Sequence, residues 1–248
     1  MAIPEPDRTI FLISELGRGA QKAFENAEQL FREASLLQAN GALSRALFLH
    51  QISMEECAKV ASLGASAVSL LTGLEVHIEK VWRNLTGHKA KNYINAYMLS
   101  PTEQENEARE RGDLKGSIEA FNKLQAAFHQ ESNTAKNASL YVDFKDGTFV
   151  APRERITEAM VTALAVKNSE FLAVTYQQVN MLMHWKDNIG DAQASLTWYK
   201  TRLEKLRSEA PDSIEVALTS LIQERLESEV ANRNRAETGR EETGSQTK

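Results

Sequence analysis

The sequence contains few residues that interrupt helices. Its 248 residues include only 12 glycines and 5 prolines, so few positions can punctuate strands and turns. Hydrophobic residues make up 42% of the chain and charged residues 25%, the proportions of a folded globular protein. The composition therefore favours a protein built mainly from helices.

Cysteine and long hydrophobic runs are also scarce. The single cysteine, Cys57, cannot form an internal disulfide, and the first residues lack the basic-then-apolar order of a secretory signal. The longest uncharged stretch, residues 60–74, is shorter than the roughly 20 residues needed to span a bilayer. We therefore expect a cytoplasmic protein without a membrane anchor.

Positive charge is in deficit. The 29 lysine and arginine residues are outnumbered by 34 aspartate and glutamate residues, which gives a formal net charge of -5. No global positive field is available to gather nucleic acid over long distances. Contact with RNA would have to be local, and Lys80, Arg83, Lys89 and Lys91 form a local basic cluster.

The first hundred residues show the periodicity of a helical bundle. Apolar and small residues recur every three or four positions over residues 7–40, and Asn40-Gly41 ends this segment. A second helix follows directly, and its short link predicts that the two helices are antiparallel neighbours. A third helix, broken near Gly64 or Thr72-Gly73, and a fourth segment complete a predicted four-helix core over residues 1–100.

The following residues predict a helical extension, residues 101–230, packed on this core. A long charged helix spans residues 103–137 and is interrupted at Gly112 or Gly116. Later helices are expected over residues 156–185, 191–208 and 213–230. Residues 231–248 are polar and poor in apolar side chains, which is typical of a disordered tail.

One segment predicts β-structure. In residues 141–150, Asp146-Gly147 lies between two short runs that alternate apolar and polar residues. This is the pattern of a hairpin with a two-residue turn. The expected fold class is therefore all-α: a helical bundle with additional C-terminal helices and one small β-hairpin.

An arginine precedes a histidine by five positions at two places, RALFLH (Arg45 to His50) and RNLTGH (Arg83 to His88). The spacing alone is weak evidence for a functional site, because a chain of this composition contains about one such match by chance. In the first match the intervening residues are all apolar and lie in a predicted helix, which favours a core or interface histidine. In the second match, Gly87 can break the helix just before His88.

The second match carries the residues for metal-independent RNA cleavage. A histidine that titrates near neutral pH can move the proton of an attacking 2′-hydroxyl, which is the role expected of His88. Arg83 is always charged and can fork onto two phosphate oxygens, while Asn84 can hydrogen-bond the phosphate or hold His88. Residues five apart on an ideal helix lie about 140° apart, so a kink or a partner chain must bring the groups together. The alternative is a surface arginine and histidine at a helix junction.

The acidic pair Glu55-Glu56, followed by Lys59, admits two interpretations. It can be a solvated helix face with an ion pair between Glu55 and Lys59, four residues apart. Alternatively, an acidic group faces the bundle and orients Arg83 or His88 across the helices.

The sequence lacks the motifs of a metal site, of a dinucleotide-binding site and of a reactive cysteine. The sequence has no HExxH, and no histidine follows a glutamate by three residues, which argues against a metal site of the helical-bundle type. Gly17 and Gly19 lack the third glycine and the preceding strand of a dinucleotide fingerprint. We therefore expect neither a metal nor a cofactor. Cys57 follows Glu56 in a predicted helix, and because an acidic neighbour disfavours a thiolate, it is expected to be a buried structural cysteine.

Four segments carry a family resemblance: FENAEQLFREASLL, ALSRALFLHQISMEECAKVA, RNLTGHKAK and LYVDFKDGTFVAP. Together they resemble the AbiV-type abortive infection proteins of the HEPN superfamily over about residues 10–185. The resemblance implies a bacterial antiphage factor on a HEPN helical bundle, in a superfamily whose active members are metal-independent ribonucleases with an Arg-x4-6-His motif. Arg83 and His88 match that motif, and Asn84 fits the polar residue often found after its arginine.

The resemblance also implies the partners. HEPN nucleases commonly dimerise so that the motifs of two protomers meet in one cleft, so we expect a homodimer with RNA as substrate and a phage or host protein as trigger. In compact HEPN domains the motif usually lies near the start of the last helix, whereas here most of the chain follows it. The later helices are therefore interpreted as an extension that covers or regulates the site.

Two functional hypotheses follow. The first is an abortive-infection effector that cleaves RNA and arrests translation or growth. Its catalytic residues are Arg83, Asn84 and His88, and its supporting residues are Glu55, Glu56 and Lys89. The second is a helical interaction module without catalysis, which senses or binds a phage or host protein.

Overall fold

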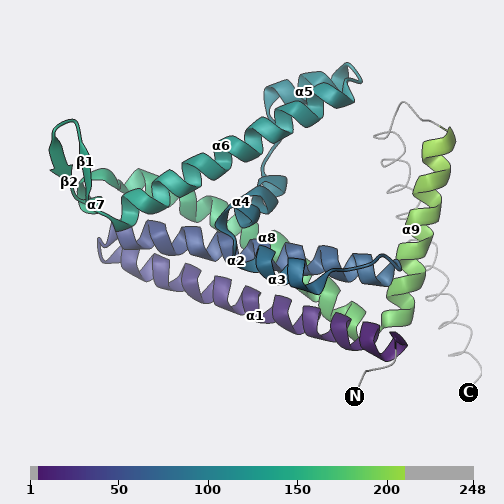
Figure 1. The fold of residues 1–248 in the computed structure, drawn as a ribbon. Coiled ribbons are helices and arrows are strands. Elements are labelled where there is room, and N and C mark those ends of the chain that lie inside the picture. Colours follow the sequence, from purple (N-terminus) through teal and green to yellow (C-terminus); the bar gives the residue numbers. More distant parts are fainter. Residues whose placement is uncertain (1–4, 210–248) are drawn as a thin grey trace, which may run out of the picture. The chain divides into compact units, whose positions relative to one another are not determined.

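The structure is a computed structural model that describes residues 5–209. The chain divides into two compact units, residues 1–192 and 193–248, and each is considered by itself. The elements of the first unit are α1 (Glu5–Ala39), α2 (Leu43–Leu71), α3 (Ile78–Thr86), α4 (His88–Asn95), the 3-10 helix η1 (Ala96–Met98), α5 (Glu103–Glu110), α6 (Leu114–Leu140), β1 (Asp143–Lys145), β2 (Thr148–Val150), α7 (Pro152–Arg155) and α8 (Glu158–Asp187) (Figure 1). Helix α9 (Ile189–Glu209) begins in the first unit and lies mostly in the second.

Three long helices, α1, α2 and α8, pack side by side and hold the core (Figure 1). Leu16 and Phe24 of α1 lie in one apolar cluster with Leu63 of α2 and Leu182 of α8. A second cluster adds Phe128 of α6. Removing such side chains from water is the main stabilising term of the fold, so helices of the predicted extension pack on the first two helices through shared apolar surface.

Helix α2 is continuous over 29 residues. The sequence predicted a break near Gly64 or Thr72-Gly73, and the helix passes through Gly64 and ends at the second place. Gly73 has a φ of 75°, a left-handed conformation that glycine adopts without steric cost. Gly64 lies where α8 packs closely, since a Cβ there would be 3.6 Å from Cδ1 of Leu182. The second predicted helix and the first part of the third are therefore one helix, and the end of the third lies in α3.

The helix predicted over residues 103–137, with an interruption at Gly112 or Gly116, is present as two helices, α5 and α6, which separate at Gly112. Gly112 has a φ of 67°. The side chain of Asp113 then accepts a hydrogen bond from the backbone N–H of Gly116 at 2.8 Å and caps α6. Gly116, the other predicted break, therefore lies in the first turn of α6.

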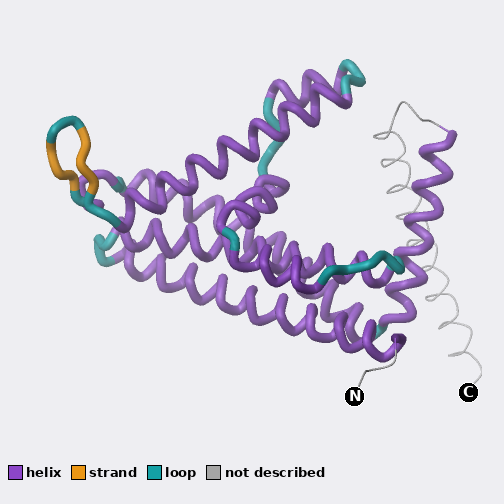
Figure 2. The backbone as a smooth tube through the Cα atoms, in the orientation of Figure 1, coloured by secondary structure: helices purple, strands orange, loops and turns teal. Residues whose placement is uncertain are grey.

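The predicted hairpin is present as strands β1 and β2, drawn in orange in Figure 2. Phe144 pairs with Phe149 across the two strands. Asp146 and Gly147 have φ values of 52° and 81°, as a tight two-residue turn requires. Within the described residues, the all-α fold class with one small hairpin is confirmed.

Helices α3 and α4 meet at Gly87, where Figure 2 shows a short loop between them. Gly87 has φ -79° and ψ 118°, an extended conformation that ends one helix and starts the next. The predicted break between Arg83 and His88 is therefore present.

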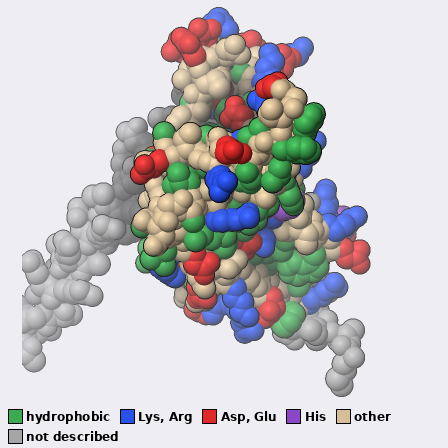
Figure 3. Space-filling model, turned by 90° about the vertical axis from the view of Figure 1, so that its left-hand side faces the viewer, with side chains coloured by type: hydrophobic (Ala, Val, Ile, Leu, Met, Phe, Trp, Pro, Cys, Tyr) green, Lys and Arg blue, Asp and Glu red, His purple; other side chains and the backbone are tan. Residues whose placement is uncertain are grey.

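The described surface is mixed in character. The face drawn in Figure 3 intersperses acidic, basic and hydrophobic side chains. No helix among the described residues is long and apolar enough to cross a membrane. The predicted helix over residues 213–230 and the predicted tail over residues 231–248 lie outside the described residues.

Candidate active site

A buried carboxylate in the middle of α2 is the centre of the candidate site. The side chain of Glu55 is only 4% exposed. It is reached by His88 and Lys91 of α4 and by Lys136 of α6. A buried carboxylate is costly unless it is paired, so these three contacts explain how the core tolerates Glu55.

His88 is the first residue of α4, and its side chain is 57% exposed. Its Nδ1 lies 2.7 Å from Oε2 of Glu55. A carboxylate accepts hydrogen bonds, so the imidazole donates its Nδ1–H, and in the neutral ring Nε2 then carries the free lone pair. The contact with Glu55 thus fixes a tautomer in which Nε2 can accept a proton.

Two lysines also contact the carboxylate, one at the oxygen that His88 contacts and one at the other oxygen. The Nζ of Lys91 lies 2.7 Å from Oε2 of Glu55, and the Nζ of Lys136 lies 3.4 Å from Oε1. Burial opposes ionisation of Glu55, but the hydrogen bonds and charges of Lys91, His88 and Lys136 outweigh it and hold the pKa of the carboxyl below its usual value. Glu55 is therefore an anion at neutral pH.

This set of groups disfavours a bound cation. Two ammonium groups share the one carboxylate beside His88, and they repel a metal ion that approaches it. In the part of the chain that the structure describes, no group of three or more His, Cys, Asp or Glu side chains could hold a metal. The chemistry that fits the donors is proton transfer next to an anion.

Helix α4 is short, and side-chain hydrogen bonds fix its position. Nδ2 of Asn95 donates to the carbonyl oxygen of Met54 at 2.8 Å, between α4 and α2. Nδ2 of Asn92 lies 3.2 Å from Nδ1 of His129 on α6. Both asparagines are buried, where hydrogen bonds that satisfy polar groups hold neighbouring helices in register.

Neither Arg83 nor Lys89 forms a hydrogen bond or ion pair with the side chain of His88. Arg83 lies in the last turn of α3; it is exposed, and its guanidinium has no partner among the described residues. The structure does not describe the side chain of Asn84. The Nζ of Lys89 lies 5.3 Å from the centre of the Tyr93 ring, a cation–π arrangement. Within one chain, the structure brings Glu55 and His88 together, while Arg83 forms no hydrogen bond or ion pair with either of them.

The pair Glu55-Glu56 does not act as a unit. Glu56 forms an ion pair with Lys59 at 2.5 Å and lines an open pocket together with Trp82 of α3. Consecutive residues on a helix point about 100° apart, so Glu55 faces α4 and α6 while Glu56 faces α3. The interpretation in which Glu55 pairs with Lys59 is wrong, since Lys59 binds the neighbouring carboxylate.

The first Arg-to-His match behaves as predicted. His50 is completely buried, and its Nδ1 lies 3.2 Å from Nδ2 of Asn168. Burial lowers the pKa of His50 to about 4. Cys57 is also buried, and burial raises the pKa of its thiol to about 12. Both are neutral core side chains.

Sequence reasoning missed the contribution of α6. Lys136 and His129 both reach the site region, although they lie far from Glu55 in the sequence. Their spacing of seven residues, two helical turns, places them on one face of α6, and this is the only signal in the sequence that could have suggested a shared role.

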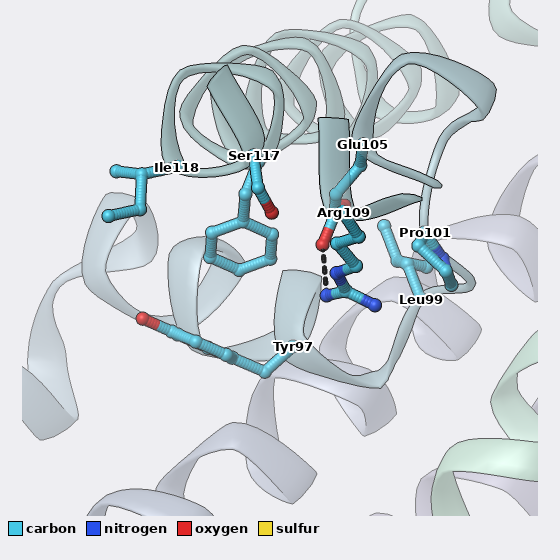
Figure 4. Close-up of a pocket in the computed structure, with 8 residues that line it drawn as sticks. Tyr97, Leu99, Pro101, Glu105, Arg109, Ser117 and Ile118 are labelled. Atoms are coloured by element: carbon cyan, nitrogen blue, oxygen red, sulfur yellow. Dashed lines mark hydrogen bonds and ion pairs between the residues drawn. The ribbon is translucent and has the colours of Figure 1, made fainter. Parts of the chain in front are cut away.

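An open pocket of about 270 Å³ lies apart from His88, between η1, α5 and α6 (Figure 4). Tyr97 and Ile118 are exposed at its edge. Inside it, Arg109 donates to Oε1 of Glu105 at 2.5 Å, the contact drawn as a dashed line. None of the predicted site residues lines this pocket.

The family model HEPN_AbiV, described as AbiV, matches residues 15–173. The uncharacterized protein y4gJ of Sinorhizobium fredii (strain NBRC 101917 / NGR234) is 41% identical over 112 residues, which is 45% of this chain and 58% of that protein. The chain thus spans less than two thirds of the length of this relative, and no solved structure matches significantly. Because the family match covers more than half of the chain, including α2 and α4, the chain belongs to the AbiV family of HEPN proteins.

Proposed function

We propose that this protein is an abortive-infection factor that cleaves RNA without a metal ion. Membership of the AbiV family supports the antiphage role. The hydrogen bond between Nδ1 of His88 and the buried carboxylate of Glu55 is the observation that carries the chemistry. It holds an exposed imidazole in the tautomer that a general base needs.

In the proposed reaction, Nε2 of His88 accepts the proton of the RNA 2′-hydroxyl. The 2′-oxygen bonds to phosphorus, the bond to the 5′-oxygen breaks, and a proton goes to that leaving oxygen. The products are a 2′,3′-cyclic phosphate and a 5′-hydroxyl. Glu55 stabilises the imidazolium that forms, because a carboxylate bonded to Nδ1 favours the charged ring.

Arg83 is the proposed phosphate clamp, assisted by Asn84 and Lys89. Its guanidinium is exposed and has no partner among the described residues, so it is available to fork onto two phosphate oxygens. Since no hydrogen bond or ion pair ties Arg83 to Glu55 or His88 within one chain, we propose that two protomers form the complete cleft. A phage or host protein is the proposed trigger, which raises a basal rate of cleavage.

The test is to incubate the purified protein with total bacterial RNA and tRNA in excess EDTA. Wild type is expected to release 2′,3′-cyclic phosphate ends, and His88→Ala is expected to lower the rate by about 10²- to 10⁴-fold. His77→Ala is the matched control, because His77 is an exposed histidine of the same region that no proposed step uses. Intact RNA with wild type, or equal rates for wild type and His88→Ala, would reject the nuclease.

A second candidate function is a helical module that binds a phage or host protein. The observation that favours it is the open pocket between η1, α5 and α6, with Tyr97 and Ile118 exposed at its edge. Exposed aromatic side chains beside a pocket are common anchors of protein interfaces. This function predicts a protein partner whose binding Tyr97→Ala abolishes and His88→Ala leaves unchanged.

A further inference from the structure

Helix α6 contributes a second histidine to the surroundings of α4. His129 lies on the face of α6 that also carries Lys136, two turns away, and Lys136 contacts Glu55. The Nδ1 of His129 lies 3.2 Å from Nδ2 of Asn92. Asn92 is four residues after His88 on α4, so the two positions share one face of this helix, about 6 Å apart.

The contacts of His129 place it next to a predicted RNA-binding residue. Its ring stands edge-on to Tyr93, with the ring centres 5.9 Å apart. The Nζ of Lys89 lies 5.3 Å from the centre of the same Tyr93 ring. His129 is partly exposed. Its ring therefore lies beside α4, next to the Tyr93 ring that also contacts the ammonium group of Lys89. Cations and aromatic rings are the groups with which proteins hold single-stranded RNA.

The two histidines are held in opposite tautomers. The side-chain NH2 of Asn92 is a donor, so Nδ1 of His129 accepts, and the ring proton lies on Nε2. Nδ1 of His88 donates to Glu55, and its Nε2 carries the lone pair. Each ring thus offers its other nitrogen, Nε2, as an acceptor on His88 and as a donor on His129.

We propose that His129 belongs to the same site and donates a hydrogen bond from Nε2–H to a non-bridging oxygen of the phosphate on which His88 acts. This inference rests on the proposed ribonuclease function. The RNA phosphate gains negative charge as the 2′-oxygen attacks, and a donor fixed in place before the reaction stabilises that charge. One chain then supplies both the acceptor for the 2′-hydroxyl proton and a donor to the phosphate.

Two substitutions separate hydrogen-bond donation from packing. His129→Phe keeps a ring against Tyr93 and removes the donor, so kcat is expected to fall about 100-fold, the usual effect of losing one such donor. His129→Gln places an amide N–H near the position of Nε2, so it is expected to stay within about tenfold of wild type. Gln125→Leu is the matched control: Gln125 lies one turn away on α6 and donates to the backbone oxygen of Tyr93 at 3.0 Å.

If His129→Phe and Gln125→Leu lower the rate equally, or if His129→Gln is as slow as His129→Phe, donation by His129 is rejected while the nuclease stands. If wild type does not cleave RNA, the proposed function fails, and the donor is tested by binding alone. A 2′-deoxy dinucleoside monophosphate, which has the phosphate without the nucleophile, is titrated into ¹⁵N-histidine-labelled protein. A shift of the His129 Nε2 resonance supports the donor, and an unchanged resonance at saturation overturns it.

Discussion

Two places in this molecule carry an arginine and a histidine at the same spacing, yet they have become different structures. His50 is enclosed in the core and bonded to Asn168, whereas His88 is largely exposed and bonded to Glu55. Gly87 breaks the helix before His88, while α2 continues without a break through His50.

The difference teaches that the spacing of two side chains sets little of their chemistry. Burial keeps His50 neutral, since its pKa is lowered to about 4, and no solvent-accessible face is left for a substrate. At His88 a buried anion fixes one ring nitrogen and the other faces outward. The environment therefore decides which match is a candidate site.

The largest expected effect is a contrast between the two arginines. Arg83→Ala is expected to lower RNA cleavage by about 10²- to 10³-fold, because the charge developing on the phosphate loses its clamp. Arg45→Ala removes an exposed arginine of the other match and is expected to leave the rate unchanged. Rates of cyclic-phosphate formation measure both variants, and equal losses would break the comparison.

The second contrast concerns the buried anion. Glu55→Gln leaves the buried Lys91 and the half-buried Lys136 without their carboxylate and is expected to lower the free energy of unfolding by about 3 kcal/mol. Glu56→Gln weakens only the partly exposed pair with Lys59 and is expected to cost less than about 1 kcal/mol. Urea denaturation at neutral pH provides both values. A smaller loss for Glu55→Gln than for Glu56→Gln would contradict the central place of Glu55.

The buried histidine predicts a pH dependence. In the unfolded chain a histidine binds a proton below about pH 6.5, whereas folded His50 binds one only near pH 4. The unfolded state is therefore favoured progressively as the pH falls from about 6.5 to about 4, and this group contributes a loss of about 2 to 3 kcal/mol by the lower limit. The stabilising effect is fully present above about pH 6.5.

His50→Asn tests this dependence, because it keeps a group that can accept the hydrogen bond of Asn168 and removes the titrating ring. The variant is expected to be less stable than wild type at pH 7 and to lose less stability than wild type between pH 7 and about pH 4.5. Parallel urea titrations at several pH values measure the difference. Equal slopes for both proteins would show that His50 does not titrate in this range.

The smallest effect is expected at Gly87, the glycine that is present in the second match and absent from the first. A Cβ on Gly87 would meet Cβ of Ala90 and the backbone oxygen of Arg83 at 3.8 Å, an ordinary contact. Gly87→Ala is therefore expected to change stability by less than about 0.5 kcal/mol. Gly73→Ala, at a φ of 75°, is expected to cost about 1 kcal/mol. If thermal unfolding shows a larger loss of stability for Gly87→Ala than for Gly73→Ala, the helix break before His88 depends on glycine.

Local patterns predicted the elements of the fold. The repeat of apolar residues in α1 and the Asp146-Gly147 turn depend on neighbours in the sequence, so both could be read directly. The choice between Gly64 and Gly73 as the end of α2 could not be predicted, because it depends on the packing of α8 beside Gly64. Because α8 is distant in the sequence, the residues around Gly64 do not indicate that this helix packs against them.

The candidate site was predictable only in part. The helix break before His88 followed from Gly87, and an acidic residue of the Glu55-Glu56 pair that faces the bundle was one of two interpretations of the sequence. Which of the two does so depends on where α4 and α6 lie. Lys136 is 81 residues from Glu55, and no periodicity in either segment encodes that contact.

Helix α4 has only eight residues, and helices of fewer than about 12 residues are marginal in water by themselves. Its order depends on buried bonds such as those of Asn95 to α2 and Asn92 to α6. A segment held in this way opens at a lower free energy than the whole domain. Helix α4 can therefore unfold locally and refold while α1, α2 and α8 stay folded. The population of the ordered arrangement around His88 is then set by this local equilibrium and not by the global stability of the domain.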